Sequence, residues 1–117
     1  FCVDESIIPY RGLWCSFKVY MKDKPHKFGI KIFMVNDAVT GYCHKFHIYQ
    51  GAGQLFPGED PVKGANWNLG ERVVMFFARA LPRGSYLFTD RYFTTIKVAK
   101  YLYHRLGVYL TGTVMEN

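Results

Sequence analysis

The stretch YLFTDRYFTT at residues 86–95 joins a predicted strand directly to a predicted helix. Tyr86–Thr89 is a short apolar run of strand length, and Asp90 closes it. Either Thr94 or Thr95 can cap the helix that follows, because a threonine hydroxyl accepts a hydrogen bond from an N–H of the first helical turn. The stretch therefore predicts a carboxylate at the end of a strand, immediately before a helix.

A second carboxylate, Asp4, lies in a strand-like run at the other end of the chain, where we predict that Phe1–Asp4 is the tail of a strand. Two carboxylates presented from neighbouring strands can share divalent metal ions, and two such cations stabilise the attacking and leaving oxygens of phosphodiester cleavage. The alternative is that Asp90 merely follows a strand and precedes a helix, as many Asp residues do. On spacing alone both interpretations stay open.

Between the two Asp residues, two apolar runs predict a hairpin. Phe28–Val35 is nearly continuous, which is typical of a central strand buried on both faces. Tyr42–Tyr49 alternates in the manner of a strand with two different faces. The polar segment Pro9–Pro25 is a predicted loop with room for one short extended piece, and the Gly-rich segment Gly51–Asn66 is a predicted long loop.

A first helix is predicted to begin after Asn68, because Glu71 follows three residues later in the pattern of a capping box. Pro82 and Gly84 mark its end. Its predicted buried face is spaced as on one side of a helix: Leu69, Val73, Phe76, Phe77 and Ala80.

A second helix is predicted after the Thr pair, and Gly107 is well placed as its left-handed C-terminal residue. Val108–Val114 is the last predicted strand. The predicted apolar stripe of this helix comprises Ile96, Ala99, Leu102, Tyr103 and Leu106.

The resulting order is strand, loop, two hairpin strands, helix, strand, helix, strand. An antiparallel hairpin followed by helical crossovers predicts a mixed α/β sheet, and this is the element order of the ribonuclease H-like fold. The 117 residues suit one compact domain. Because the chain starts with Phe1 and stops just after a strand-like run, we expect it to be an excised piece of a longer protein.

The formal net charge of +6 favours a polyanionic partner, such as nucleic acid or an anionic membrane surface, although ordinary surface solubility explains it equally well. Arg11 and Arg91 lie near the two Asp residues in sequence and are candidate contacts to DNA phosphates. No apolar stretch reaches the roughly 20 residues that span a bilayer, so no membrane partner is expected. The densest basic stretch contains further DNA-contact candidates, with a solvated loop face as the alternative: Lys18, Lys22, Lys24, His26, Lys27 and Lys31.

Other groups that could carry chemistry have simpler structural interpretations. Glu5 should point to the face opposite Asp4, and Asp37 suits a turn. The side chains of His44 and His47 should lie on opposite faces of a strand, which argues against a zinc site. The three cysteines, Cys2, Cys15 and Cys43, are odd in number and form no Cys-x-x-Cys pair, so neither a disulfide framework nor a structural zinc site is expected.

The chain resembles the catalytic domain of piggyBac-like transposases from end to end. Each shared motif is weak alone, but their order and intervals together are specific. The motifs are Asp4-Glu5-Ser6, Pro9-Tyr10-Arg11-Gly12, Lys24-Pro25-His26-Lys27-Phe28-Gly29-Ile30-Lys31, Gly41-Tyr42, Asp90-Arg91-Tyr92-Phe93-Thr94-Thr95 and Gly112-Thr113-Val114.

The resemblance implies a DNA strand transferase whose metal site holds three Asp residues with Mg²⁺ or Mn²⁺. By motif, Asp4 and Asp90 match the first two, and the resemblance implies that the third lies beyond Asn117, as does the family's cysteine-rich zinc module. The resemblance therefore implies that residues 1–117 are the front part of a single ribonuclease H-like catalytic domain, incomplete at its C-terminal end. We expect this fragment alone to be inactive. Arg91 is a departure, because the family more often has Asn there.

The same resemblance implies that double-stranded DNA, as transposon ends and target, is the partner of a nuclear protein that can form a homodimer. An alternative is a domesticated, transposase-derived protein that binds DNA or chromatin without cutting it.

Overall fold

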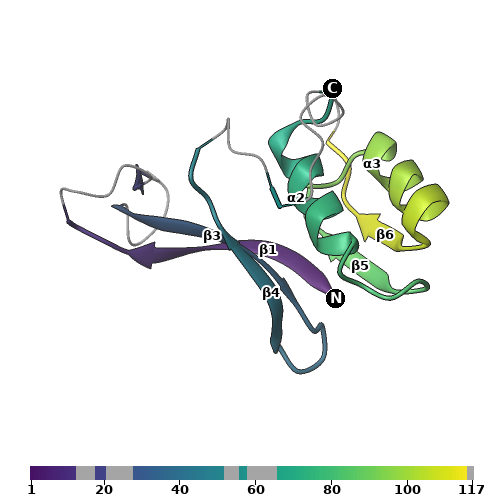
Figure 1. Ribbon diagram of the computed structural model, residues 1–117, viewed down its shortest axis with the longest axis horizontal. Helices are drawn as coiled ribbons and strands as arrows, with labels where there is room; N and C mark the ends of the chain where they lie inside the picture. The colour runs from purple at the N-terminus through teal and green to yellow at the C-terminus, as the bar shows by residue number, and fades with distance from the viewer. Residues whose placement is uncertain (13–17, 21–27, 52–55, 58–65, 116–117) are drawn as a thin grey trace.

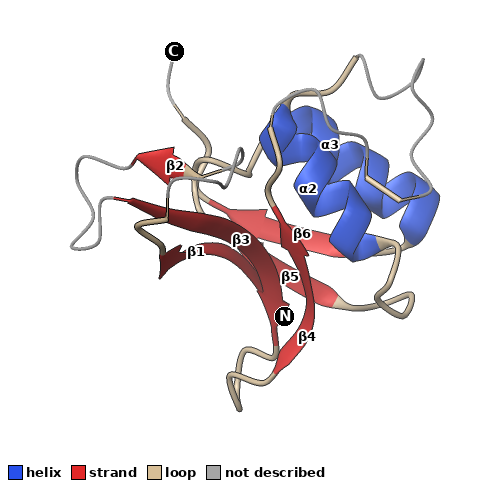
Figure 2. Ribbon diagram, turned by 60° about the vertical axis from the view of Figure 1, so that its left-hand side comes forward, coloured by secondary structure: helices blue, strands red, loops and turns tan. Residues whose placement is uncertain are grey.

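The computed structural model describes residues 1–12, 18–20, 28–51, 56–57 and 66–115. Its elements alternate as a mixed α/β chain, which confirms the predicted class (Figures 1 and 2). In chain order they are β1 (Cys2–Pro9), β2 (Val19–Tyr20), β3 (Phe28–Asn36), β4 (Cys43–Ile48), α2 (Leu69–Ala78), β5 (Tyr86–Thr89), α3 (Ile96–Tyr101) with a π-helical turn at Leu102–Leu106, and β6 (Tyr109–Gly112). None of these described helices is long and apolar enough to cross a membrane.

The described strands form a six-stranded mixed sheet in the order β2-β3-β1-β5-β6, with β4 also paired to β3. β3 is antiparallel to β1, β2 and β4, as expected for strands joined without a helical crossover. β5 is parallel to β6, to which it is connected through α3, and it is also parallel to β1. The predicted hairpin of β3 and β4 is confirmed, with a register shift at Val35/Asn36.

The prediction that the first strand ends at Asp4 is wrong, because β1 continues to Pro9. Its residues pair one by one with β3, from Cys2 opposite Asn36 to Pro9 opposite Gly29. The polar residues Glu5 and Ser6 interrupt the apolar run in the sequence, but the hydrogen bonds to β3 hold them in extended conformation. Asp4 therefore lies within a strand and not at its end.

The prediction that the strand at 28–35 is buried on both faces is also wrong. Phe33 and Val35 are fully buried, whereas Ile32 and Met34, which alternate with them, are partly exposed. The reason is that α2 and α3 lie on the same side of the sheet (Figure 2). The described strands therefore have one covered face and one open face.

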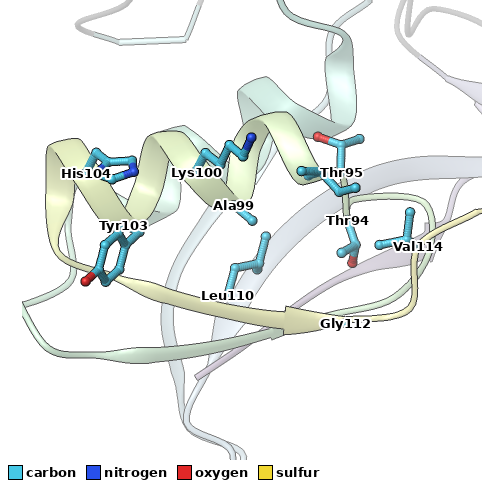
Figure 3. Close-up of a pocket in the computed structure, with 10 residues that line it drawn as sticks. Thr94, Thr95, Ala99, Lys100, Tyr103, His104, Leu110, Gly112 and Val114 are labelled. Atoms are coloured by element: carbon cyan, nitrogen blue, oxygen red, sulfur yellow. The ribbon is translucent and has the colours of Figure 1, made fainter.

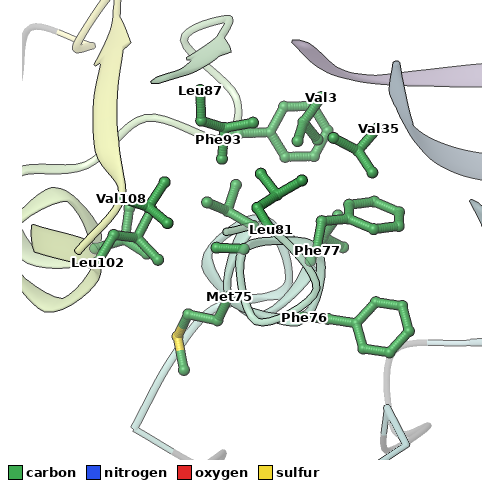
Figure 4. Packing of buried hydrophobic residues seen from close by; sticks show 14 of the residues in the cluster. Val3, Val35, Met75, Phe76, Phe77, Leu81, Leu87, Phe93, Leu102 and Val108 are labelled. Atoms are coloured by element: carbon green, nitrogen blue, oxygen red, sulfur yellow. The ribbon is translucent and has the colours of Figure 1, made fainter. Parts of the chain in front are cut away.

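The core lies between the sheet and α2, which Figure 4 shows end-on. Val3, Val35 and Leu87 reach it from the strands, and Leu102 and Val108 close its other side. The capping box that starts α2 is confirmed, since Asn68 Oδ1 accepts from Glu71 N–H at 2.8 Å and Glu71 Oε1 accepts from Asn68 N–H at 3.0 Å. Of the predicted buried face of this helix, Ala80 is exposed, because the helix ends at Ala78.

The stripe predicted for α3 is only partly right. Val98 and Leu102 form its buried face, while Ile96 and Tyr103 are 63% and 54% exposed. These two exposed side chains, together with Leu110 and Val114, line a pocket of about 340 Å³ between α3 and β6 (Figure 3). Gly107 ends the helical segment with φ +64°, the left-handed conformation predicted for it.

Candidate active site at the β1–β5 pair

The parallel pairing of β1 with β5 brings the two candidate metal ligands to matching positions on neighbouring strands. Cys2 pairs with Phe88, and Asp4 and Asp90 each follow the paired residue by two. Asp4 lies on the open face of the sheet, because it alternates with buried Val3. Asp90 is the first residue after β5 and is also exposed. The role of the pair as metal ligands remains a prediction.

Each of the two carboxylates is fixed by a local backbone hydrogen bond. Asp4 Oδ1 accepts from the N–H of Glu5 at 2.8 Å, and Asp90 Oδ1 accepts from the N–H of Tyr92 at 2.9 Å. Within the described part of the chain, neither Oδ2 accepts a hydrogen bond. One oxygen of each carboxylate is thus anchored and the other is available to a ligand.

The residue types and their number fit a magnesium-like ion. Mg²⁺ keeps several waters and is usually held by one or two carboxylates, so two exposed Asp side chains suit it. Among the described residues, no three His, Cys, Asp or Glu side chains gather closely enough to enclose a metal ion. The pair therefore fits a partly hydrated ion and not a closed structural site.

The segment after Asp90 is a compact turn that holds this residue in place. The backbone carbonyl of Asp90 accepts from Phe93 N–H at 3.2 Å, from Thr94 N–H at 3.1 Å and from the Thr94 hydroxyl at 2.7 Å. Thr94 Oγ1 also lies 2.6 Å from Thr89 Oγ1. Thr95, and not Thr94, caps α3, since its hydroxyl accepts from Val98 N–H at 3.1 Å. The two threonines therefore have different tasks.

Gly112 on β6 makes room for this turn. It pairs with Thr89, and a methyl group on its Cα would fall on Thr94 Oγ1 and on the Thr89 carbonyl. A side chain at 112 would thus push on the two groups that hold the turn.

We expect Gly112→Ala to lower the free energy of unfolding by about 2 kcal/mol, as overpacking a closely fitted position does. Urea denaturation followed by circular dichroism measures the change. The control is Gly41→Ala, because Gly41 has no atom within 4 Å of the added methyl and its cost comes only from a φ of +75°. The chemical shift of the Thr94 amide is a second measurement, because it reports directly on the turn. If Gly112→Ala changes this shift as little as Gly41→Ala does, Gly112 does not support the turn.

Glu71, whose side chain caps α2 as predicted, has a second hydrogen-bond partner in the structure. Its side chain is buried at 5% exposure, and Oε2 accepts from the Thr95 hydroxyl at 2.7 Å. One carboxylate therefore connects the N-termini of α2 and α3. Gly70 lies beside it, where a methyl group would come within 2.8 Å of the Tyr92 carbonyl oxygen, so α2 packs directly on the turn that follows Asp90.

Lys31 belongs to the basic stretch for which the sequence favours DNA contact, but the structure largely encloses its side chain within the protein. Its Nζ lies 2.9 Å from Glu5 Oε2, and its side chain is only 14% exposed. Alternation could have revealed this, because Lys31 shares a strand face with Phe33 and Val35. Glu5 likewise points to the covered face, away from Asp4, as predicted. Burial raises the pKa of the neighbouring Tyr92 phenol above its ordinary value, and the positive charge of Lys31 opposes that rise.

The other DNA-contact candidates have different positions. Arg11 follows β1 and Arg91 follows Asp90, and both are exposed. Lys18 Nζ donates to the Gly12 carbonyl at 3.1 Å and lies 5.2 Å from the Phe28 ring centroid. Lys22, Lys24, His26 and Lys27 lie outside the described residues.

The remaining polar candidates occupy the positions predicted for them, Asp37 in a turn and the two histidines apart from each other on β4. Asp37 Oδ1 accepts from the N–H groups of Val39 and Thr40 at 2.9 and 2.8 Å, and the bond from Thr40 contributes most to lowering the pKa of that carboxyl. His44 is exposed beside Phe1, with ring centroids 5.5 Å apart, whereas His47 packs on Phe56 at 4.5 Å. The two histidines do not converge on a metal site.

Comparison with known proteins places this architecture in a family. A family model described as Transposase IS4 matches residues 1–117, the whole chain. The chain is also similar to a solved structure described as the cryo-EM structure of a piggyBac transposase synaptic complex with hairpin DNA, at 34% identity and a TM-score of 0.81. That match covers 99% of this chain and 23% of the other. No curated protein matches the chain. Because the family model spans every residue and the structural similarity spans nearly all of them, the chain belongs to the piggyBac-like transposase family.

Proposed function

We propose that the chain is the front part of a ribonuclease H-like catalytic domain that cleaves and joins DNA strands with the help of a divalent metal ion. The observation that carries the proposal is the parallel register of β1 and β5, which gives Asp4 and Asp90 matching positions. Paired strands lie about 4.8 Å apart, a separation that side-chain oxygens on both can bridge to a common cation. Family membership supports the same assignment.

The proposed roles of the residues follow from their positions. Asp4 and Asp90 would hold Mg²⁺ or Mn²⁺ through the oxygens that accept no hydrogen bond in the described structure. A metal ion bound there would stabilise negative charge on the oxygens of the reacting phosphodiester. The family pattern calls for a third Asp, which none of the 117 residues matches, so we expect this chain to bind the metal weakly and not to cut DNA by itself.

The proposed partner is double-stranded DNA, as transposon ends and target. The net charge of +6 favours a polyanion, and the similar solved structure is described as a complex with hairpin DNA. Arg11, Lys18, Lys24, Lys27 and Arg91 are the proposed phosphate contacts. A nuclear location and a homodimer of the whole protein are part of the same proposal.

The test is titration of the ¹⁵N-labelled chain with MnCl₂, whose unpaired electrons broaden nearby amide signals. We expect the signals of residues 4–5 and 90–92 to broaden first. Asp4→Asn and Asp90→Asn should each weaken Mn²⁺ binding at this place by at least about tenfold, since even loss of a group that only supports a ligand costs that much.

Asp37→Asn is the matched control, because it removes an exposed carboxylate from the β3–β4 turn and should leave the broadening unchanged. Equal broadening in the wild type and both site variants would overturn the metal site. If these variants also bound duplex DNA as the wild type does, the result would favour the alternative of a transposase-derived protein that binds DNA without cutting it.

A further inference from the structure

Lys31 lies where three segments of the candidate site meet. It projects from β3 onto the covered face of the sheet, and its ammonium group pairs with the Glu5 carboxylate at 2.9 Å. Both side chains are largely shielded from water, at 14% and 22% exposure. A lysine so enclosed contributes little to a DNA-binding surface, so its contacts within the protein must explain its position.

Three aromatic rings surround the same ammonium group. Nζ lies 5.3 Å from the ring centroid of Phe33, 5.6 Å from that of Tyr49 and 5.7 Å from that of Tyr92. Each distance is within the roughly 6 Å over which a cation is attracted to a ring face. Phe33 belongs to β3 and Tyr49 directly follows β4, whereas Tyr92 belongs to the turn after β5.

Two of the partners of Lys31, Glu5 and Tyr92, are close in sequence to a candidate metal ligand. Glu5 follows Asp4 directly, and its backbone N–H donates to Asp4 Oδ1. Tyr92 follows Asp90 by two residues, and its backbone N–H donates to Asp90 Oδ1. The residue that anchors each carboxylate through its backbone is therefore also held by Lys31 through its side chain.

We propose that Lys31 is a positioning residue that fixes Asp4 relative to Asp90 by holding Glu5 and Tyr92 at once. This inference rests on the proposed metal site. β1 and β5 share one paired position, Cys2 with Phe88, so the described backbone pairing does not reach Asp4 and Asp90 themselves. The Lys31 side chain supplies a connection at that level of the two strands, beside the packing of Phe33 on Phe93 at 6.1 Å.

The test compares Lys31→Met and Lys31→Arg with the wild type. Methionine keeps an unbranched apolar side chain but removes the charge, and we expect Mn²⁺ binding at Asp4 and Asp90 to weaken by about tenfold, as when a group supporting metal ligands is lost. Arginine keeps the charge, the pair with Glu5 and the attraction to rings, and should restore most of the affinity. The double variant Lys31→Met/Glu5→Gln also removes the carboxylate that Lys31→Met leaves without its ammonium partner. Its Mn²⁺ affinity should equal that of Lys31→Met.

Lys45→Met is the matched control. Lys45 lies on β4 with its Nζ 4.2 Å from the Phe76 ring centroid, so it too loses a cation over a ring, but it contacts neither Glu5 nor Tyr92. Its Mn²⁺ affinity should equal that of the wild type. Unchanged Mn²⁺ affinity in Lys31→Met, with the wild-type site intact, would overturn the positioning role and leave the proposed function standing.

Amide hydrogen exchange separates the two proposals without any metal. In Lys31→Met we expect the Tyr92, Phe93 and Thr94 amides to exchange about tenfold faster, while the α2 amides stay unchanged. If the wild type bound no Mn²⁺ at the Asp pair yet this acceleration appeared, the proposed function would fail and the link from Lys31 to the turn would hold. If the turn amides did not accelerate, Lys31 would not hold the turn.

Discussion

Replacing Phe93 with Ala is expected to lower the free energy of unfolding by about 4 kcal/mol, the usual range for truncating a buried Phe. The side chain is 1% exposed and lies between the turn after Asp90 and the sheet. Its ring packs edge-on against Phe33 at 6.1 Å and against Tyr92 at 4.9 Å. Truncation would leave a cavity beneath the turn, so we expect Mn²⁺ affinity at the Asp pair to fall as well. Urea denaturation and the MnCl₂ titration measure the two effects.

Phe46→Ala is the control for this prediction. Phe46 lies on β4 with its side chain 59% exposed, so the same truncation should change stability by less than about 1 kcal/mol. In Phe93→Leu the leucine side chain fills most of the space, so the loss in free energy of unfolding should be roughly a third of that in Phe93→Ala. A cost below 1 kcal/mol for Phe93→Ala would show that the turn does not depend on the core beneath it.

Replacing Glu71 with Ala is expected to cost about 3 kcal/mol. The buried carboxylate accepts from Asn68 N–H and from the Thr95 hydroxyl, and a hydrogen bond to a charged group contributes about 1.5–3 kcal/mol. The change also removes the capping box of α2. Thermal and urea unfolding report the loss, and the Val98 amide should exchange faster because the cap of α3 loses its support.

Glu71→Gln separates the charge of this side chain from its shape. The amide keeps one acceptor oxygen, so we expect Glu71→Gln to lower the free energy of unfolding by about half as much as Glu71→Ala. A double-mutant cycle that combines Glu71→Gln with Thr95→Ser should give a coupling free energy near zero, because serine keeps the hydroxyl that donates to residue 71. If Glu71→Ala proved as stable as the wild type, the junction between the two helices would rest on apolar packing alone.

The elements set by local chemistry were predicted from the sequence. Asn68 and Glu71 cap α2 as expected, because both partners of the capping box lie within one helical turn. Tyr86–Thr89 is β5 with the predicted bounds. Gly107 has the left-handed φ that its position after the helical segment requires.

The failed predictions concern features that depend on distant partners. β1 passes through Asp4 because β3 supplies hydrogen bonds as far as Pro9. Ile96 and Tyr103 are exposed because the hydrophobic core packs against the Val98 and Leu102 side of this helical segment. Lys31 is enclosed because Glu5 and Tyr92, both far from it in the sequence, meet it on the covered face of the sheet. In each case a contact distant in sequence decided between two locally acceptable arrangements.

The sequence by itself determined the mixed α/β order, the cap of α2, the family and the identity of Asp4 and Asp90 as candidate ligands, because these depend on residue type and spacing. Only the tertiary structure decided which residues meet: the register of β1 against β5, the link from Glu71 to Thr95, and the enclosure of Lys31 by Glu5 and Tyr92. The physical reason is that strand pairing and side-chain packing join segments many residues apart, and no local pattern encodes the position of one segment relative to another.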